Sequence, residues 1–237
     1  GAPAVMDKTL RAKAAVACGA DLVVELPTTV SLSSAEGFAA GGVGILSKLC
    51  DALCFGAETG EAELLMETAR VLLSEDFSPL LRQELDSGKS FPAARAGALA
   101  QMGLSGEILR RPNDILAIEY LKALRRQKAP MEPLAVLRQG AGHDGAPSGD
   151  TASASYLRTL LRSGRTDEAL SYLPAPAAQV LRRELALGQA PADLSYCHRA
   201  ILARLRQLRE EDFLPYDGGK EGLYHRFYQA VRTSCSP

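Results

Sequence analysis

The sequence predicts an α/β fold, in which a parallel sheet with helices on both faces precedes an all-helical region. Two observations carry this prediction. Over the first two thirds of the chain, short apolar runs alternate with longer amphipathic segments, which is typical of parallel sheets. After Thr166 only helical patterns follow. We therefore expect an α/β domain over residues 1–165 and a helical domain over residues 166–237.

Three apolar runs are predicted as strands. Residues 20–27 (ADLVVELP) are apolar at several consecutive positions, as in a parallel strand that is covered on both faces. Residues 51–58 (DALCFGAE) and 133–140 (PLAVLRQG) follow the same pattern and end in glycine or polar residues. Open α/β sheets bind ligands at the carboxyl ends of their strands, so these ends are candidate sites.

The segments between and after these runs have the spacing of amphipathic helices. In chain order, the predicted helices cover residues 3–18, 34–49, 60–75, 78–88, 91–103, 110–127, 151–158, 166–173, 176–188 and 193–208. Helix 193–208 places five apolar residues on one face: Leu194, Cys197, Ile201, Leu205 and Leu208. Arg199 and Arg206 lie on the opposite face.

The composition is that of an ordinary globular protein. Of 237 residues, 46% are hydrophobic and 23% are charged. No apolar run approaches the roughly 20 residues that a membrane-spanning helix needs, so we expect no membrane partner. The five cysteines are odd in number and complete no zinc-ligand pattern. We expect reduced, mostly buried thiols in a cytoplasmic protein.

Charge is distributed unevenly along the chain. The net charge is −1, yet residues 151–209 hold nine Arg, no Lys and only four acidic residues. The planar guanidinium suits recognition of phosphate, so this excess favours a nucleic-acid surface that includes Arg199 and Arg206. A solvated helical surface explains the same excess equally well.

Three polar positions fall at ends of predicted elements. Gly56 ends a strand, where the missing side chain lets a ligand approach closely, although a plain turn glycine explains it too. Asn113 opens a helix after Pro112; it can reach a nucleotide or simply cap the helix. Arg138 ends the third strand and is either a phosphate clamp or a surface arginine.

A second cluster opens the helix predicted over residues 151–158. Ser153 and Ser155 are ordinary helix-start residues singly, but with Arg158 on the following turn they form an anion cradle. No nucleophile elbow, Walker motif or metal-ligand set is present, so no catalytic residue is assigned and no metal ligand is expected. Residue chemistry alone therefore indicates an α/β domain with an anion site.

Six blocks of the sequence can be compared with known families: CGADLVVELP, DALCFGAE, RPNDILAIEYLKAL, LRQGAGHDG, SASYLR and YDGGKEGLYHRF. In this order they resemble the bacterial tRNA(Met) cytidine acetate ligase family of the nucleotidyltransferase superfamily. The resemblance implies a Rossmann-like nucleotidyltransferase sheet followed by helices. It also implies activation of acetate with ATP and Mg to acetyl-adenylate, then N4-acetylation of the wobble cytidine of elongator tRNA(Met).

The resemblance also implies roles for single residues. Gly56, Asn113 and Arg138 match positions that contact ATP in the family. The segment that holds Ser153, Ser155 and Arg158 resembles the superfamily's second, phosphate-contacting signature.

The sequence departs from the family pattern at both ends. The first signature, His-x-Gly-His, is expected upstream of Gly1, together with the central strand of the sheet. Loss of that strand would expose two strand edges, so we expect the physical protein to carry upstream residues or to borrow the strand from another copy. Two other functions stay open: a non-catalytic nucleotide- or RNA-binding fragment, and a small-substrate adenylyltransferase.

Overall fold

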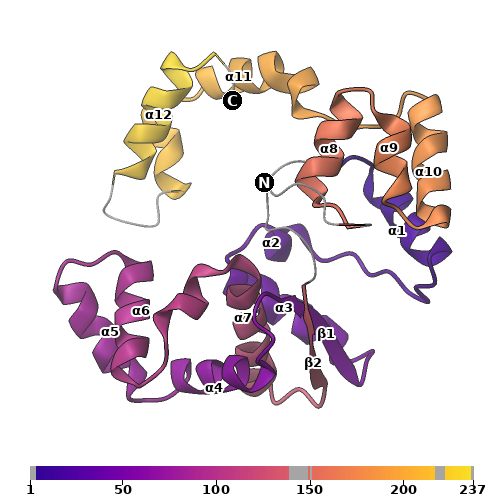
Figure 1. The fold of residues 1–237 in the computed structure, drawn as a ribbon. Helices are drawn as coiled ribbons and strands as arrows, with labels where there is room; N and C mark the ends of the chain where they lie inside the picture. The colour runs from indigo at the N-terminus through magenta and orange to yellow at the C-terminus, as the bar shows by residue number, and fades with distance from the viewer. Residues whose placement is uncertain (1–3, 139–148, 150, 217–221, 236–237) are drawn as a thin grey trace. The chain divides into compact units, whose positions relative to one another are not determined.

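The computed structural model describes residues 4–138, 149, 151–216 and 222–235. The chain forms two compact units (Figure 1), one of residues 24–140 and one of residues 1–23 with 141–237. These limits differ from the boundary expected at residue 165. The division of function at residue 165 stays a prediction.

The unit of residues 24–140 contains a parallel pair of strands, as predicted. Its elements are α2 (Thr28–Ser31), α3 (Ala35–Leu46), β1 (Ala52–Ala57), α4 (Ala62–Leu72), α5 (Phe77–Asp86), α6 (Phe91–Gln101), the 3-10 helix η1 (Gly106–Arg110), α7 (Pro112–Gln127) and β2 (Glu132–Leu137). The register places Gly56 opposite Val136 and Ala57 opposite Leu137. The α/β fold class is therefore confirmed.

Within this unit only one face of the sheet is covered. Burial alternates along β1, where Leu53, Phe55 and Ala57 are buried while Cys54 and Gly56 between them are exposed. On β2, Leu134 is 44% and Val136 is 53% exposed. The expectation that helices of an α/β domain cover both faces is thus not met within this unit.

The strand predicted over residues 20–27 is wrong. These residues have no strand assignment in the structure, and Leu22, Val23 and Val24 are exposed. An apolar run forms a strand only where a neighbour pairs with its backbone, and among the described residues β1 pairs with β2 alone. The boundary between the two units also falls inside the run, after Val23.

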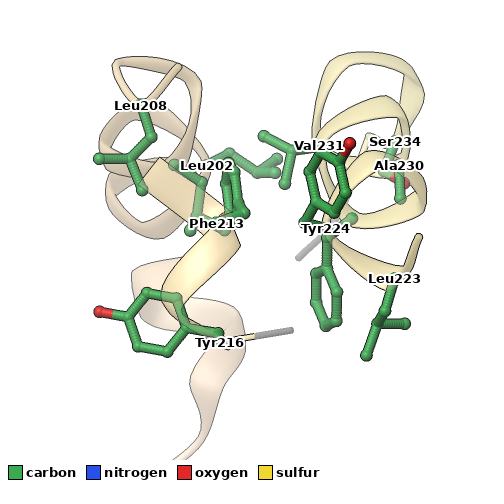
Figure 2. A pocket seen from close by; sticks show the side chains of 11 residues that line it. Leu202, Leu208, Phe213, Tyr216, Leu223, Tyr224, Ala230, Val231 and Ser234 are labelled. Carbon is green, nitrogen blue, oxygen red and sulfur yellow. The ribbon is translucent and has the colours of Figure 1, made fainter. Parts of the chain in front are cut away.

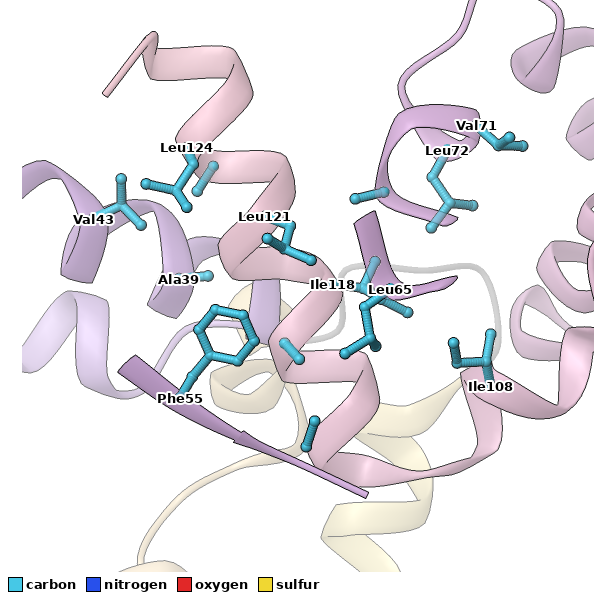
Figure 3. Close-up of a cluster of buried hydrophobic side chains, with 14 of the residues drawn as sticks. Ala39, Val43, Phe55, Leu65, Val71, Leu72, Ile108, Ile118, Leu121 and Leu124 are labelled. Carbon is cyan, nitrogen blue, oxygen red and sulfur yellow. The ribbon is translucent and has the colours of Figure 1, made fainter. Parts of the chain in front are cut away.

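Helix α7 forms the centre of the core of this unit. Figure 3 shows Ile118, Leu121 and Leu124 of α7 between side chains of α3 and side chains of α4. Phe55 of β1 stacks on Tyr120 of α7, with ring centroids 5.8 Å apart. This packing fixes the start of α7 relative to the sheet.

The second unit is helical in its described residues. Its elements are α1 (Lys8–Ala17), α8 (Ala154–Arg162), α9 (Thr166–Ser171), α10 (Ala175–Ala186), η2 (Leu194–Cys197), α11 (His198–Arg206), η3 (Glu210–Tyr216) and α12 (Leu223–Thr233). Leu160, Leu170 and Leu181 form a separate core here. Helix α1 packs on α10, and the Ala192 N–H donates to the Val5 carbonyl (2.9 Å), so the N-terminal segment joins this unit.

The cysteines differ from the expectation based on composition. All five cysteines are exposed, so the expectation of mostly buried thiols is wrong. Within the residues that the structure describes, no helix is both long and apolar enough to span a bilayer.

Candidate functional site

The first cluster lies where β1 and β2 end. Gly56 lies inside β1 with no left-handed φ, so it is not a turn glycine. The Arg138 N–H donates to the Ala57 carbonyl (2.8 Å), which extends the pairing of the two strands by one residue. A Cβ on Gly56 would lie 3.5 Å from Cγ of Arg138. The Arg138 side chain therefore lies along the exposed face of the sheet, over Gly56.

Asn113 is held by an acid from the loop after β1. The N-cap of α7 is Arg111 and Pro112 is the first helical residue, so the expected alternative role of Asn113 as the N-cap is wrong. Its Nδ2 donates to Oε1 of Glu58 (2.5 Å). Because a carboxylate only accepts hydrogen bonds, this contact fixes the amide orientation and leaves Oδ1 of Asn113 as an acceptor.

Asp114 joins the same loop to α7, and the sequence analysis missed it. Its side chain is 0% exposed. Its Oδ1 accepts from the backbone N–H groups of Glu58 (2.7 Å) and Thr59 (3.0 Å). Its Oδ2 has no hydrogen-bond partner among the described residues. The one available signal was an acid in the first turn of a helix, which usually indicates only a favourable helix start.

The second cluster lies at the start of α8, in the helical unit. Ser153 is the N-cap, and its Oγ accepts from the Tyr156 N–H (3.2 Å). Ser155 is in the first turn and Arg158 follows one turn later. Nε of Arg158 is buried and has no partner among the described residues. A guanidinium N–H can donate to an acceptor such as a phosphate oxygen.

The two arginines expected to contact RNA differ in their surroundings. Nε and NH2 of Arg206 donate to the carbonyls of Val231 (3.2 Å) and Ser234 (2.8 Å), at the end of α12. Arg199 is exposed and has no side-chain partner within the described part of the chain. Arg206 therefore holds two helices together, while Arg199 is available to a ligand.

A cavity of about 440 Å³ lies between α11, η3 and α12 (Figure 2). Its lining is almost entirely apolar and includes Leu202, Phe213, Tyr224 and Val231. No group of three or more His, Cys, Asp or Glu side chains in the described residues is placed to hold a metal ion.

A family model covers almost the whole chain. The HIGH Nucleotidyl Transferase model matches residues 1–236. The chain belongs to this family. This confirms the superfamily that the six sequence blocks indicated.

Several curated proteins are similar to nearly all of this chain. The protein named tRNA(Met) cytidine acetate ligase from Kosmotoga olearia is 36% identical over 98% of this chain and 57% of its own length. The protein of the same name from Halothermothrix orenii is 34% identical, over 99% of this chain and 59% of its own. The chain thus spans less than two thirds of the length of these relatives.

Solved structures of a related protein have a similar fold. Thermotoga maritima TmcAL bound with α-thio ATP is similar with a TM-score of 0.87 and 31% identity, over 99% of this chain and 57% of that one. The apo form of the same protein gives a TM-score of 0.90 at 32% identity, over 58% of its length. The fold of this chain is therefore shared with a protein whose structure was solved with an ATP analogue.

Proposed function

We propose that this chain is the nucleotide-binding part of a cytoplasmic tRNA(Met) cytidine acetate ligase. The observation that carries the proposal is the likeness to Thermotoga maritima TmcAL bound with α-thio ATP, at a TM-score of 0.87 over 99% of the chain. The repeated name tRNA(Met) cytidine acetate ligase among the curated relatives supports the same activity.

The proposed reaction has two steps. A carboxylate oxygen of acetate attacks the α-phosphorus of ATP, which forms acetyl-adenylate and releases pyrophosphate. N4 of the wobble cytidine in elongator tRNA(Met) then attacks the acetyl carbonyl carbon, releases AMP and loses a proton. Both steps develop charge on phosphate oxygens, which positioned N–H donors stabilise.

Two sets of residues are proposed to contact the nucleotide. Gly56, Asn113 and Arg138 are proposed to contact ATP at the carboxyl edge of the strands. Ser153, Ser155 and Arg158 are proposed to contact phosphate, which the unpartnered Nε of Arg158 supports. We propose that Mg²⁺ arrives with the triphosphate, since Mg²⁺ binds through substrate phosphates and few protein ligands.

The tRNA is proposed to contact Arg199 and Arg206. The exposure of Arg199 and its lack of a partner among the described residues support this role. The bonds of Arg206 to the end of α12 add a structural role to its proposed contact with RNA.

Nucleotide binding is tested first, by calorimetric titration of this chain with ATP. Acetate-dependent ATP–pyrophosphate exchange is measured on this chain and on a version extended at its N-terminus with a His-x-Gly-His segment. Transfer of labelled acetate to tRNA(Met) completes the test. We expect binding by this chain, and exchange and transfer by the extended version.

The two rival functions predict other combinations. A non-catalytic nucleotide- or RNA-binding protein binds ATP or RNA but shows no exchange in either version. A small-substrate adenylyltransferase shows exchange with another acid and transfers nothing to tRNA. Absence of ATP binding by both versions contradicts the proposed function.

A further inference from the structure

Only one oxygen of the buried Asp114 carboxylate has hydrogen-bond partners among the described residues. One oxygen anchors the backbone of residues 58–59, at 2.7 and 3.0 Å. The other oxygen has no hydrogen bond among the described residues. The nearest cation is NH1 of Arg111 at 3.8 Å, beyond hydrogen-bond range, on a side chain that is 52% exposed.

The anchoring role alone does not explain a charged residue at this position. An asparagine would offer the same carbonyl oxygen to the two N–H groups and would bury no charge. Burying a carboxylate with an unsatisfied oxygen is unfavourable, so buried polar groups in native proteins nearly always have a hydrogen-bond partner. The unused acceptor therefore points to a donor that binds to the folded protein.

The position of Asp114 says where that donor lies. The loop it anchors begins two residues after Gly56, and its neighbour Asn113 bonds to Glu58 of the same loop. Asp114 thus lies among the residues proposed to contact ATP, at the carboxyl end of β1. Phosphate oxygens bear negative charge and repel a carboxylate, so the donor belongs to the nucleoside.

We infer that Oδ2 of Asp114 accepts a hydrogen bond from the nucleoside part of the bound nucleotide. The donor is a ribose hydroxyl or the exocyclic amino group of the base, both of which are neutral donors. The inference rests on the proposed function, because it assumes that the ligand is a nucleotide. It assigns a specificity role to a residue that also positions Glu58 and Thr59.

Asp114→Asn tests this inference with little change in shape. The variant keeps an oxygen for the N–H groups of Glu58 and Thr59 but replaces the free acceptor by an NH2 donor. Without nucleotide, we expect its melting temperature to equal or exceed that of the wild type. Its dissociation constant for ATP should rise about tenfold or more, the usual effect of losing a hydrogen bond to a charged group. Glu107→Gln, at an exposed acid paired with Arg110, is the matched control.

Nucleotide analogues identify the donor. Calorimetric titrations compare ATP with 2′-deoxy-ATP, 3′-deoxy-ATP and purine riboside triphosphate, which lacks the amino group. The analogue without the relevant donor should bind the wild type more weakly than ATP does and should be insensitive to Asp114→Asn.

Two results overturn the inference. One is equal ATP affinity for Asp114→Asn and the wild type. The other is a melting temperature several degrees lower for Asp114→Asn without nucleotide, which would show that the fold itself uses the charge. The melting temperature tests the inference even if the wild type binds no ATP. Absence of ATP binding by the wild type would contradict the proposed function.

Discussion

Single residues carry the clearest functional signals in this chain. Among the described residues, the buried side-chain atoms without a hydrogen-bond partner are Oδ2 of Asp114 and Nε of Arg158. One is an acceptor and the other a donor, and each lies in the first two turns of a helix.

Arg158→Met should weaken ATP binding about tenfold or more, because it removes a charged donor but keeps an apolar stem. Calorimetric titration measures the affinity. Arg165→Met is the control, since Arg165 is exposed and paired with Glu168. Equal affinities in the two variants would remove Arg158 from the phosphate site.

Arg199→Glu should weaken tRNA(Met) binding and flatten its dependence on salt, since fewer counterions are released per complex. The melting temperature should not change, because the side chain has no partner among the described residues. Filter binding over a range of salt concentrations measures both effects. Arg82→Glu, an exposed site on α5, should leave binding unchanged. If the two variants behave alike, the arginine excess is a solvated surface.

The sequence could point to Asn113 and Arg158 but not to what each contacts. A polar residue after a proline at a helix start predicts a cap, and only the fold shows that Glu58 holds the Asn113 amide. The role of Asp114 could not be predicted from the sequence for a related reason. Its burial depends on a loop 55 and 56 residues away in sequence. Contacts between distant segments depend on tertiary packing, which local patterns do not encode.

At the scale of elements, α3, α6 and α7 are joined by a partly buried ionic network. Glu119 of α7 contacts Arg95 of α6 (2.7 Å) and Lys122 (2.6 Å). Lys122 also contacts Glu36 of α3 (3.4 Å). Glu119 and Lys122 are nearly fully buried, so each charge depends on its partners.

Glu119→Ala should therefore lower the free energy of unfolding by about 3–5 kcal/mol, because it leaves Lys122 and Arg95 without their buried partner. Urea denaturation measures the change. Glu67→Ala removes an exposed pair with Arg70 and should cost far less stability, because solvent screens exposed ion pairs. Similar losses in both variants would mean that solvent screens the network.

Glu36 gives this network a dependence on pH. The hydrogen bond from Arg126, together with the nearby charge of Lys122, holds the pKa of the Glu36 carboxyl below its ordinary value of 4.5. Its contribution to stability is therefore complete above pH 4.5 and is lost as pH falls through the lower, folded-state pKa. Glu36→Gln should lose less stability than the wild type on acidification below pH 4.5. Denaturation curves at neutral and acidic pH measure these losses. Equal losses of stability in Glu36→Gln and the wild type would show that Glu36 does not cause the pH dependence.

Periodicity predicted most elements correctly, and the exceptions have physical reasons. The predicted strands 51–58 and 133–140 overlap the paired strands β1 and β2, where each strand offers the other a backbone edge. Residues 20–27 are also rich in apolar residues but have no such neighbour within the described residues. Helix α12 was missed, although Leu223, Phe227 and Val231 recur every four residues and line the cavity of Figure 2.

At the scale of the whole chain, each unit has its own apolar core. Leu65 lies in the core of residues 24–140 and Leu160 lies in the core of the helical unit. Leu65→Ala and Leu160→Ala should each cost about 2–5 kcal/mol. In scanning calorimetry we expect them to shift different transitions, with additive effects in the double variant. A single transition that both substitutions shift equally would contradict independent units.

The open face of the two-stranded sheet has a practical consequence for chemical labelling. Cys54 is exposed on β1, two residues before Gly56 and therefore on the same face of the strand. A thiol-reactive fluorophore can reach it, and a nucleotide bound over Gly56 should slow the reaction. Cys50 and Cys197, also exposed, provide reference rates within the same molecule. The protein thus carries its own reporter of occupancy at the strand ends, which mass spectrometry of labelled peptides can monitor without any substitution.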